Sequence, residues 1–282
     1  MMKIICNEKS QVLAAKTAKS TGLELVPTEF KKFPDGELYV KTGIVDSETV
    51  IIASITDSDS FIQTLLLIDA CVGSDVTLVI PYMGYARQDK KFNDGEPVSA
   101  RAIARALSNG INRVYTINIH EKAVLDFFSV PAEDLSLAPF IGDYISSMNL
   151  ENPLILAPDK GAAEFAKDVS ENTGLECDYL HKTRLSGTEV RMEPKNLPAL
   201  DRCVVIVDDI ISTGGTLATA TGMLKEQGAT EVHAICVHGV FAAGGFAKLS
   251  AGGPASVISS DTIESASSKV SVAECIKSAL IK

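Results

Sequence analysis

The stretch VVIVDDIISTGGT, residues 204–216, decides the fold because it joins a strand-like segment to a helix-like segment through an acidic, glycine-rich turn. Its first residues are branched and apolar, which is typical of a strand buried on both faces of a parallel sheet. Asp208 and Asp209 follow this run, and hydroxyl residues and glycines then lead into a helix that we expect to begin near Leu217. A strand, a turn and a helix in this order form the repeating unit of α/β folds.

The same alternation of strand-like and helix-like segments extends over the rest of the chain. The segments that we predict to be strands are residues 3–6, 23–26, 49–55, 76–81, 113–119, 154–158, 203–208, 231–237 and 256–260. Those that we predict to be helices are residues 61–73, 99–110, 161–174, 216–228 and 271–282. Ser99 is placed to cap the second helix, and Gly174 lies where a left-handed residue would end the third.

So many strands exceed one ordinary doubly wound sheet, so we predict an α/β chain of two domains. Each domain is expected to be a largely parallel sheet flanked by helices, with the first in residues 1–143 and the second in residues 144–282. Residues 185–201 are rich in turn formers and charges, and we expect a flexible loop or hairpin there. The sequence leaves open which domain the last helix packs against.

Composition limits the partners of the protein. The formal net charge is -10 and the pI is about 5.0, so no broad basic surface is expected to bind a nucleic acid or an anionic membrane. The N-terminus has no signal-peptide pattern, and no apolar segment is long enough to span a bilayer, which favours a cytoplasmic location. The six cysteines have no C-x-x-C spacing and no histidine at metal-ligand spacing, so we expect reduced cysteines in the core.

The turn in residues 212–216 is suited to a phosphate group. In an open α/β sheet, ligands collect at the carboxyl ends of the strands, and glycines there let backbone amides approach an anion at a helix N-terminus. Ser212, Thr213 and Thr216 add hydroxyl donors, and the carboxylates of Asp208 and Asp209 can accept hydrogen bonds from vicinal hydroxyls. A sugar phosphate meets these demands. The alternative is a turn whose acids only cap the helix, but two acids ending a buried strand are costly without partners.

Other polar residues also follow predicted strands. His120 and Asp159 are placed to share a divalent cation, although histidine is an unusual magnesium ligand and a water can intervene. Lys182 and Arg184 are two residues apart, and therefore on one side of an extended segment, where they could stabilise a transferring phosphoryl group. Taken alone, an exposed basic turn explains that pair equally well. Arg87 follows another strand, where it could pair with a phosphate or stack on a base.

Taken together, these motifs resemble those of the ribose-phosphate pyrophosphokinases, a family that makes phosphoribosyl pyrophosphate. The motifs FPDGE, PYMGYARQDKK, INIH, FFSVP, APDKG, HKTR and VVIVDDIISTGGT occur in the order seen in that family and cover almost the entire chain. The resemblance implies two phosphoribosyltransferase-like domains. It also implies transfer of the diphosphoryl group of ATP to the anomeric hydroxyl of ribose 5-phosphate, with Mg²⁺, in a homo-oligomer of at least two subunits.

The resemblance also implies a role for each motif. The turn at Asp35, Gly36 and Glu37 would hold adenine in the site of a neighbouring subunit, with Arg87 and Gln88 contacting the nucleotide. His120 and Asp159 would hold magnesium, and Lys182 would be the catalytic lysine with Arg184 as its partner. The ribose 5-phosphate site would consist of the following residues: Arg184, Asp208, Asp209, Ser212, Thr213, Gly214, Gly215 and Thr216.

Two alternatives and two departures accompany this resemblance. A phosphoribosyltransferase would use the same sugar-phosphate loop without ATP, and a noncatalytic regulatory homologue would assemble with active subunits. Many family members have aspartate where this chain has Ser212. Many also carry basic and hydroxyl residues where this chain reads FNDGEP, and there Asp94 and Glu96 would repel a regulatory phosphate or ADP. The departures bear on regulation more than on catalysis.

Overall fold

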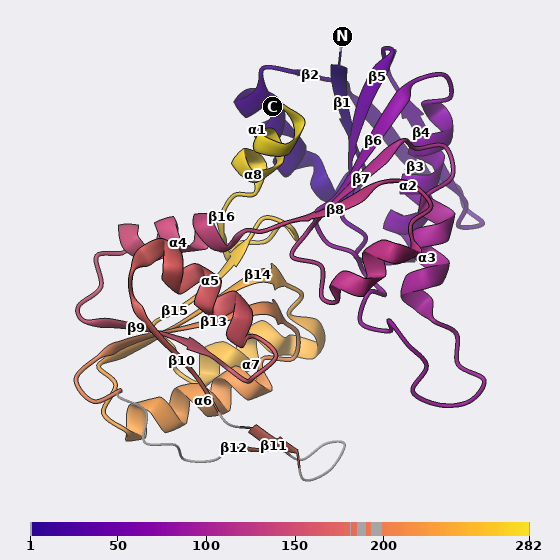
Figure 1. The fold of residues 1–282 in the computed structure, drawn as a ribbon. Helices are drawn as coiled ribbons and strands as arrows, with labels where there is room; N and C mark the ends of the chain where they lie inside the picture. The colour runs from indigo at the N-terminus through magenta and orange to yellow at the C-terminus, as the bar shows by residue number, and fades with distance from the viewer. Residues whose placement is uncertain (1, 181, 185–189, 193–198, 282) are drawn as a thin grey trace. The chain divides into compact units, whose positions relative to one another are not determined.

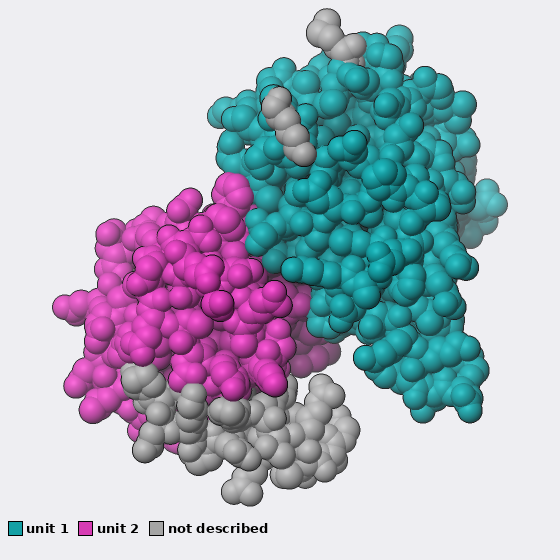
Figure 2. Space-filling model, in the orientation of Figure 1, with its two compact units in different colours: residues 1–136, 262–264, 271–282 teal, residues 137–261, 265–270 magenta. Residues whose placement is uncertain are grey.

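The computed structural model describes residues 2–180, 182–184, 190–192 and 199–281, with side chains described for 2–180 and 199–281. The chain forms two compact units (Figure 2). The first comprises residues 1–136, 262–264 and 271–282, and the second comprises residues 137–261 and 265–270. The predicted boundary between residues 143 and 144 lies within a helix, α4 (Ala138–Ser147), and the division into folding domains stays a prediction.

The first unit contains a six-stranded sheet in the order β2-β1-β5-β6-β7-β8, in which every neighbouring pair is parallel (Figure 1). Its strands are β1 (Met2–Cys6), β2 (Glu24–Leu25), β5 (Glu48–Ile52), β6 (Asp75–Ile80), β7 (Arg113–Ile117) and β8 (Ala132–Leu135). The central strands consist largely of buried aliphatic residues, as is expected when helices cover both faces of a parallel sheet.

Helices cover the two faces of this sheet. Helices α2 (Ser58–Ala70) and α3 (Ser99–Leu107) share a core with one set of alternating strand residues, such as Ile51 and Leu78. Helices α1 (Gln11–Thr21) and α8 (Ala273–Leu280) pack against each other, with Leu13 and Ile276 fully buried. The last helix therefore belongs to the first unit, which answers a question that the sequence left open. Two short 3-10 helices, Glu8–Ser10 and Lys122–Phe127, complete the helices described in this unit.

The second unit repeats this architecture with the strand order β10-β9-β13-β14-β15-β16, again with parallel neighbours throughout. Its strands are β9 (Pro153–Ala157), β10 (Glu176–Tyr179), β13 (Cys203–Ile211), β14 (Glu231–Gly239), β15 (Ser256–Ser260) and β16 (Ser268–Val270). Helices α6 (Gly215–Glu226) and α7 (Gly245–Ala251) share a core with Val204, Ile206 and Val232. Helix α4 packs against α5 (Ala163–Thr173), and α5 contacts β9 and β13.

Two antiparallel hairpins lie outside the main sheets. One pairs β3 (Thr28–Lys32) with β4 (Leu38–Thr42), and the other pairs β11 (Lys182–Arg184) with β12 (Val190–Met192). Of the segment predicted as a loop or hairpin, residues 190–192 form β12, while residues 185–189 and 193–198 lie outside the described residues.

The two parallel sheets confirm the predicted fold class, while some local predictions were wrong. Three helices, α1, α4 and α7, were not predicted, and Ser99 does not cap α3, because the residue that precedes the helix is Val98. Gly174 does end α5 in a left-handed conformation with a φ of 69°. Among the described residues, no helix is both long and apolar enough to cross a bilayer.

The carboxylate of Asp134 fixes the chain where it leaves β7. One oxygen, Oδ1, accepts hydrogen bonds from Thr116 Oγ1 at 2.6 Å and from the backbone N–H of Ile119 at 2.9 Å. Asn118, between these two residues, has a φ of 42° and donates its N–H to the carbonyl of Leu135 at 3.0 Å. Burial raises the pKa of Asp134 above its ordinary value, despite the two donors. The edge strand β8 therefore determines the course of the segment that leads to His120.

We expect Asp134→Ala to lower the free energy of unfolding by about 1–3 kcal/mol, because two donors lose their acceptor. Asp134→Asn keeps an oxygen that can accept both bonds, so it should cost less than about 1 kcal/mol near pH 7. Because the folded state raises this pKa, the stability contributed by Asp134 is present below the ordinary aspartate pKa and is lost as pH rises through the raised one. Urea unfolding at several pH values should show that the free energy of unfolding of Asp134→Asn increases relative to that of the wild type as pH increases. A difference independent of pH would contradict this assignment.

Candidate functional site

The acidic pair lies at the carboxyl end of the second sheet. Pairing of β13 with β14 continues to Ile211 opposite Gly239, so Asp208 and Asp209 lie within the strand and do not follow it as the sequence predicted. The strand is longer than expected because its partner is equally long and supplies hydrogen bonds over the whole length. Each carboxylate also accepts a bond from the next backbone N–H, at 2.9 Å for Asp208 and 2.8 Å for Asp209.

Three carboxylates in this unit influence one another. Burial raises the pKa of Asp208 well above its usual range, and the negative charges of Asp209 and Asp159 raise it further. Asp159 follows β9, the strand beside β13, and its Oδ1 accepts the N–H groups of Gly161 at 2.9 Å and Ala162 at 3.3 Å. The fold thus brings together two predicted sugar-binding acids and one predicted magnesium ligand. Groups that donate hydrogen bonds, or a cation, would relieve this accumulation of negative charge.

Residues 212–216 form the turn between β13 and α6. Gly214 precedes the helix in the left-handed conformation, with a φ of 69°, and its carbonyl accepts the N–H of Ala218 at 2.9 Å. The residue at the N-cap position is Gly214, which has no side chain to cap the first turn of α6. The amides at the start of this 12-residue helix are therefore oriented as anion-binding groups at the positive end of the helix dipole.

A second glycine, which sequence reasoning missed, permits this turn. A Cβ atom on Gly214 would lie 2.4 Å from the carbonyl oxygen of Gly245, and one on Gly245 would lie 2.3 Å from the carbonyl oxygen of Ser212. The first residue of α7 and the turn are thus in backbone contact, which only glycine allows. The signal in the sequence was the pair Gly244 and Gly245, two glycines that follow the neighbouring strand β14.

Lys248, also missed by sequence reasoning, approaches the same turn. Its Nζ lies 3.1 Å from where a Cβ atom on Gly215 would stand, at the first residue of α6. Lys248 is exposed and forms no ion pair with a described residue. An ammonium group thus lies beside the positive end of a helix dipole, an arrangement that an anion would stabilise.

In the first unit, the predicted residues again follow the carboxyl ends of strands. His120 is exposed and follows β7, after the segment that Asp134 holds. Arg87 is exposed and Gln88 is half-buried in the loop after β6. The Gln88 side chain accepts a hydrogen bond from Ser99 Oγ, so Ser99 ties this loop to the start of α3.

The turn at residues 35–37 forms the tip of the β3–β4 hairpin. Gly36 has a φ of 98° and donates its N–H to the carbonyl of Phe33 at 2.9 Å. Asp35 and Glu37 are exposed, and the Asp35 carboxylate accepts only the backbone N–H of Glu37, at 3.2 Å, among the described residues. Neither acid is needed to stabilise another part of its own unit, so both are available to a ligand.

Lys182 and Arg184 lie on β11, which pairs with β12. Their side chains lie outside the described part of the structure. In the first unit, the acidic segment at residues 92–97 departs from the pattern of the family that the sequence resembles, and its Glu96 is bonded within the segment. The Glu96 carboxylate accepts the side-chain amide of Asn93 at 2.6 Å and the backbone N–H groups of Phe92 at 2.9 Å and Asn93 at 3.1 Å, and these donors lower its pKa.

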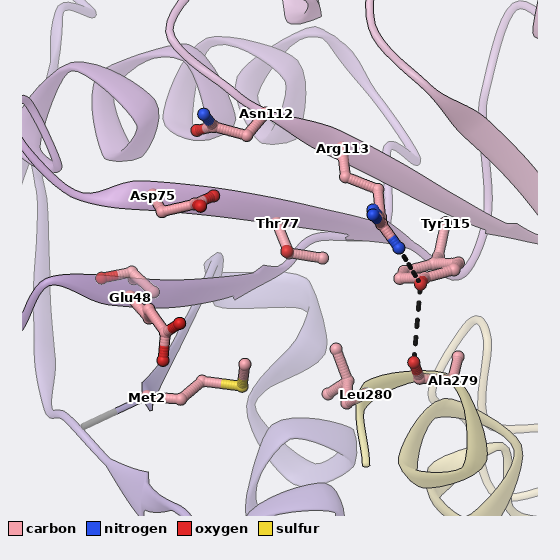
Figure 3. A pocket seen from close by; sticks show the side chains of 10 residues that line it. Met2, Glu48, Asp75, Thr77, Asn112, Arg113, Tyr115, Ala279 and Leu280 are labelled. Carbon is pink, nitrogen blue, oxygen red and sulfur yellow. Dashed lines mark hydrogen bonds between the residues drawn. The ribbon is translucent and has the colours of Figure 1, made fainter. Parts of the chain in front are cut away.

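A separate pocket of about 250 Å³ opens at the amino ends of β5, β6 and β7 (Figure 3). Arg113 donates to the hydroxyl of Tyr115 at 3.1 Å, and that hydroxyl bonds to the carbonyl of Ala279 on α8 at 3.5 Å. Glu48 and Asp75 line the pocket beside them. Because it lies at the opposite edge of the sheet from Arg87 and His120, it contains none of the predicted site residues.

Comparison with known proteins identifies the family. Residues 2–110 match the model of the N-terminal domain of ribose phosphate pyrophosphokinase, and residues 131–271 match the phosphoribosyl transferase domain. The chain is 50% identical over 283 aligned positions to a ribose-phosphate pyrophosphokinase of Methanosarcina mazei, covering 99% of this chain and 95% of that one. It is 49% identical to that of Methanosarcina acetivorans, covering 99% of both chains.

A solved structure supports the fold at the level of the whole chain. The crystal structure of phosphoribosylpyrophosphate synthetase from Mycobacterium smegmatis has a TM-score of 0.84 and 25% sequence identity, and the match covers 99% of this chain and 97% of that chain. The predicted pair of phosphoribosyltransferase-like domains is therefore confirmed as the fold class. The chain belongs to the ribose-phosphate pyrophosphokinase family.

Proposed function

We propose that the protein is a ribose-phosphate diphosphokinase, a transferase that serves nucleotide biosynthesis. It transfers the diphosphoryl group of ATP to the anomeric hydroxyl of ribose 5-phosphate, giving phosphoribosyl pyrophosphate and AMP. A bond forms between the anomeric oxygen and the β-phosphorus, and the bond from the β-phosphorus to the oxygen bridging it to the α-phosphorus breaks. No side chain needs to be modified covalently.

The observation that carries this proposal is the first turn of α6, which begins after a glycine N-cap and lies just beyond two carboxylates near the end of β13. The first-turn amides and Lys248 bind the 5-phosphate, with the hydroxyls of Ser212, Thr213 and Thr216 as further donors. Asp208 and Asp209 then accept hydrogen bonds from the ribose hydroxyls. These contacts fix the sugar, so that the anomeric hydroxyl has one orientation relative to the diphosphoryl group.

Residues outside this loop bind ATP. Arg87 and Gln88 contact the nucleotide, and the exposed hairpin tip at Asp35 and Glu37 binds adenine in the site of a neighbouring subunit. The exposure of both acids, without further partners in their own unit, supports this role. The active protein is therefore a homo-oligomer of at least two subunits. We place it in the cytoplasm, without a nucleic-acid or membrane partner.

Lys182 and Arg184 stabilise the charge that develops as AMP leaves. Lysine supplies a compact positive charge, and arginine supplies a planar fork that can bind two oxygens of a phosphoryl group. Such groups contribute more in the transition state than in the ground state when charge increases between the phosphorus and the leaving oxygen. Two cationic residues on one short strand suit this task.

The donor set fits Mg²⁺. Asp159 offers a carboxylate oxygen, the ligand type that magnesium prefers, and it lies near Asp208, whose pKa is raised by burial and then by the charges of Asp209 and Asp159. Asp159 and His120 would hold the ion. When bound, magnesium neutralises part of the triphosphate charge.

A phosphorus NMR time course with ATP, Mg²⁺ and ribose 5-phosphate tests this function. We expect AMP and a new diphosphorylated ribose signal that both require the sugar, which a control without ribose 5-phosphate would establish. ADP as the product would indicate ordinary phosphoryl transfer instead. No reaction with ATP, together with pyrophosphate release from phosphoribosyl pyrophosphate and a nucleobase, would favour a phosphoribosyltransferase.

Gly214→Ala should abolish most binding of ribose 5-phosphate, because the new methyl group would force the turn away from Gly245. Gly22→Ala is the matched control. Gly22 also has a left-handed conformation, with a φ of 75°, but no atom lies within 4 Å of the position that its Cβ atom would take. Both variants carry a backbone penalty of about 1–2 kcal/mol. Calorimetric titration should show lost sugar-phosphate affinity only for Gly214→Ala. Equal affinity in the two variants would contradict the loop assignment.

Lys248→Met should raise the KM for ribose 5-phosphate about tenfold with little change in kcat, because one charge-assisted contact to the 5-phosphate is lost. The side chain of methionine keeps much of the apolar contact of the lysine stem. Lys19→Met, which removes an exposed lysine from α1, is the control and should leave the KM unchanged. Steady-state kinetics at low and high salt would check this, and the difference between Lys248→Met and wild type should shrink as salt increases.

A further inference from the structure

Three potential metal ligands converge at the amino end of the second sheet. Within the described residues, Cys203, Glu231 and His233 form the only group of three or more such side chains whose ligand atoms all lie within 4.8 Å of one another. Cys203 begins β13 and is paired with Glu231 of β14, and His233 lies two residues further along the same strand. Strand alternation therefore places all three side chains on one face.

The environment of His233 resembles that of a metal-bound histidine. The ring is buried, with Nε2 lying 3.1 Å from a carboxylate oxygen of Glu231 and Nδ1 lying 2.8 Å from Ser256 Oγ. Metal-binding histidines commonly donate their second ring N–H to an oxygen that orients the imidazole. The hydroxyl of Ser256 can either donate to Nδ1 or accept from it, so the ring can bind a metal through Nε2 without turning.

Cys203 is buried beside the carboxylate of Glu231, its partner across the β13–β14 pair. A cation between the two groups would replace repulsion with attraction and make the thiolate the favoured form.

We propose that Cys203, Glu231 and His233 bind a zinc ion, with water in the fourth position. A thiolate, an imidazole and a carboxylate form a donor set that favours Zn²⁺ over Mg²⁺, because magnesium prefers oxygen ligands. Tetrahedral zinc ligands lie roughly 3–4 Å apart, so the observed separations need only small side-chain rotations. Binding releases one proton, from the thiol of Cys203. The proton of the neutral imidazole moves from Nε2 to Nδ1, where it forms a hydrogen bond to Ser256 Oγ.

This zinc site is separate from the proposed catalytic site. Cys203 and Asp208 lie near opposite ends of β13, five residues apart and therefore roughly 16 Å along the strand. The amino ends of β13 and β14 carry the zinc ligands, and their carboxyl ends carry the sugar-phosphate turn. Zinc at this position would fasten two central strands together and stabilise the folded state without taking part in diphosphoryl transfer.

Cobalt substitution tests this proposal in the whole protein. Protein stripped of metal with a chelator should bind one equivalent of Co²⁺ and develop a near-ultraviolet thiolate-to-cobalt absorption band, which Zn²⁺ should abolish. Zn²⁺ should also raise the midpoint of thermal unfolding, whereas millimolar Mg²⁺ should not displace cobalt. Failure of the wild-type protein to develop the band would overturn the proposal, whatever the outcome of the diphosphokinase assay.

Variants identify the ligands. Cys203→Ser should lose the cobalt band, while the matched control Cys177→Ser, which removes a half-buried cysteine from β10 of the same sheet, should keep it. Ser256→Ala should weaken zinc binding about tenfold, because the imidazole loses its orienting partner. If circular dichroism shows that Cys203→Ser is unfolded, His233→Gln serves in its place and should weaken binding at least tenfold. Unchanged affinity in a folded ligand variant would refute the site.

Discussion

The parallel pairing of β13 with β14 is the constraint on which the second unit depends. Their hydrogen bonds run from Cys203 opposite Glu231 to Ile211 opposite Gly239, and both strands are almost entirely buried until the acidic pair. A register shift of one residue would move every side chain to the opposite face, so the pairing determines which groups meet at both ends. At one end it holds two carboxylates in the strand beside the turn. At the other it places a thiol next to a carboxylate and an imidazole.

Close backbone approach is the second constraint, and it explains why glycines are concentrated after these strands. Helix α7 can reach the sugar-phosphate turn because Gly245 has no side chain, and that approach brings Lys248 to the start of α6. A bulkier residue at either contact would separate the turn from α7, and the lysine would no longer reach it. Geometry and charge at this site are therefore coupled through a contact between main chains, which no single functional side chain reveals.

The sequence predicted the two parallel sheets because long runs of buried aliphatic residues have few other structural interpretations. It missed α1, whose buried residues include Ala14 and Thr17 and give little apolar contrast. It also missed α4, because the domain boundary predicted between residues 143 and 144 falls within this helix. In this helix, Gly142 allows close packing on α5, since a Cβ atom there would lie 3.2 Å from Asn172 and Thr173.

Residues 212–216 could be predicted because strand, turn and helix are contiguous. The approach of Lys248 to the turn and the clustering of Cys203 with Glu231 and His233 could not be predicted, because they depend on contacts between segments that are distant in sequence.

The chain has a formal net charge of -10, and the reaction of its family requires it to bind two phosphorylated, negatively charged substrates. Long-range attraction cannot supply the binding energy, since the overall field repels both ligands. In the proposed site, the amides at the start of α6 would solve the problem locally, because they offer partial positive charge without changing the net charge and lose their effect within a turn of helix. Lys248 would then act at contact distance. Asp208 and Asp209 could lie beside a phosphate in this site because ribose hydroxyls and a divalent cation would meet the carboxylates directly.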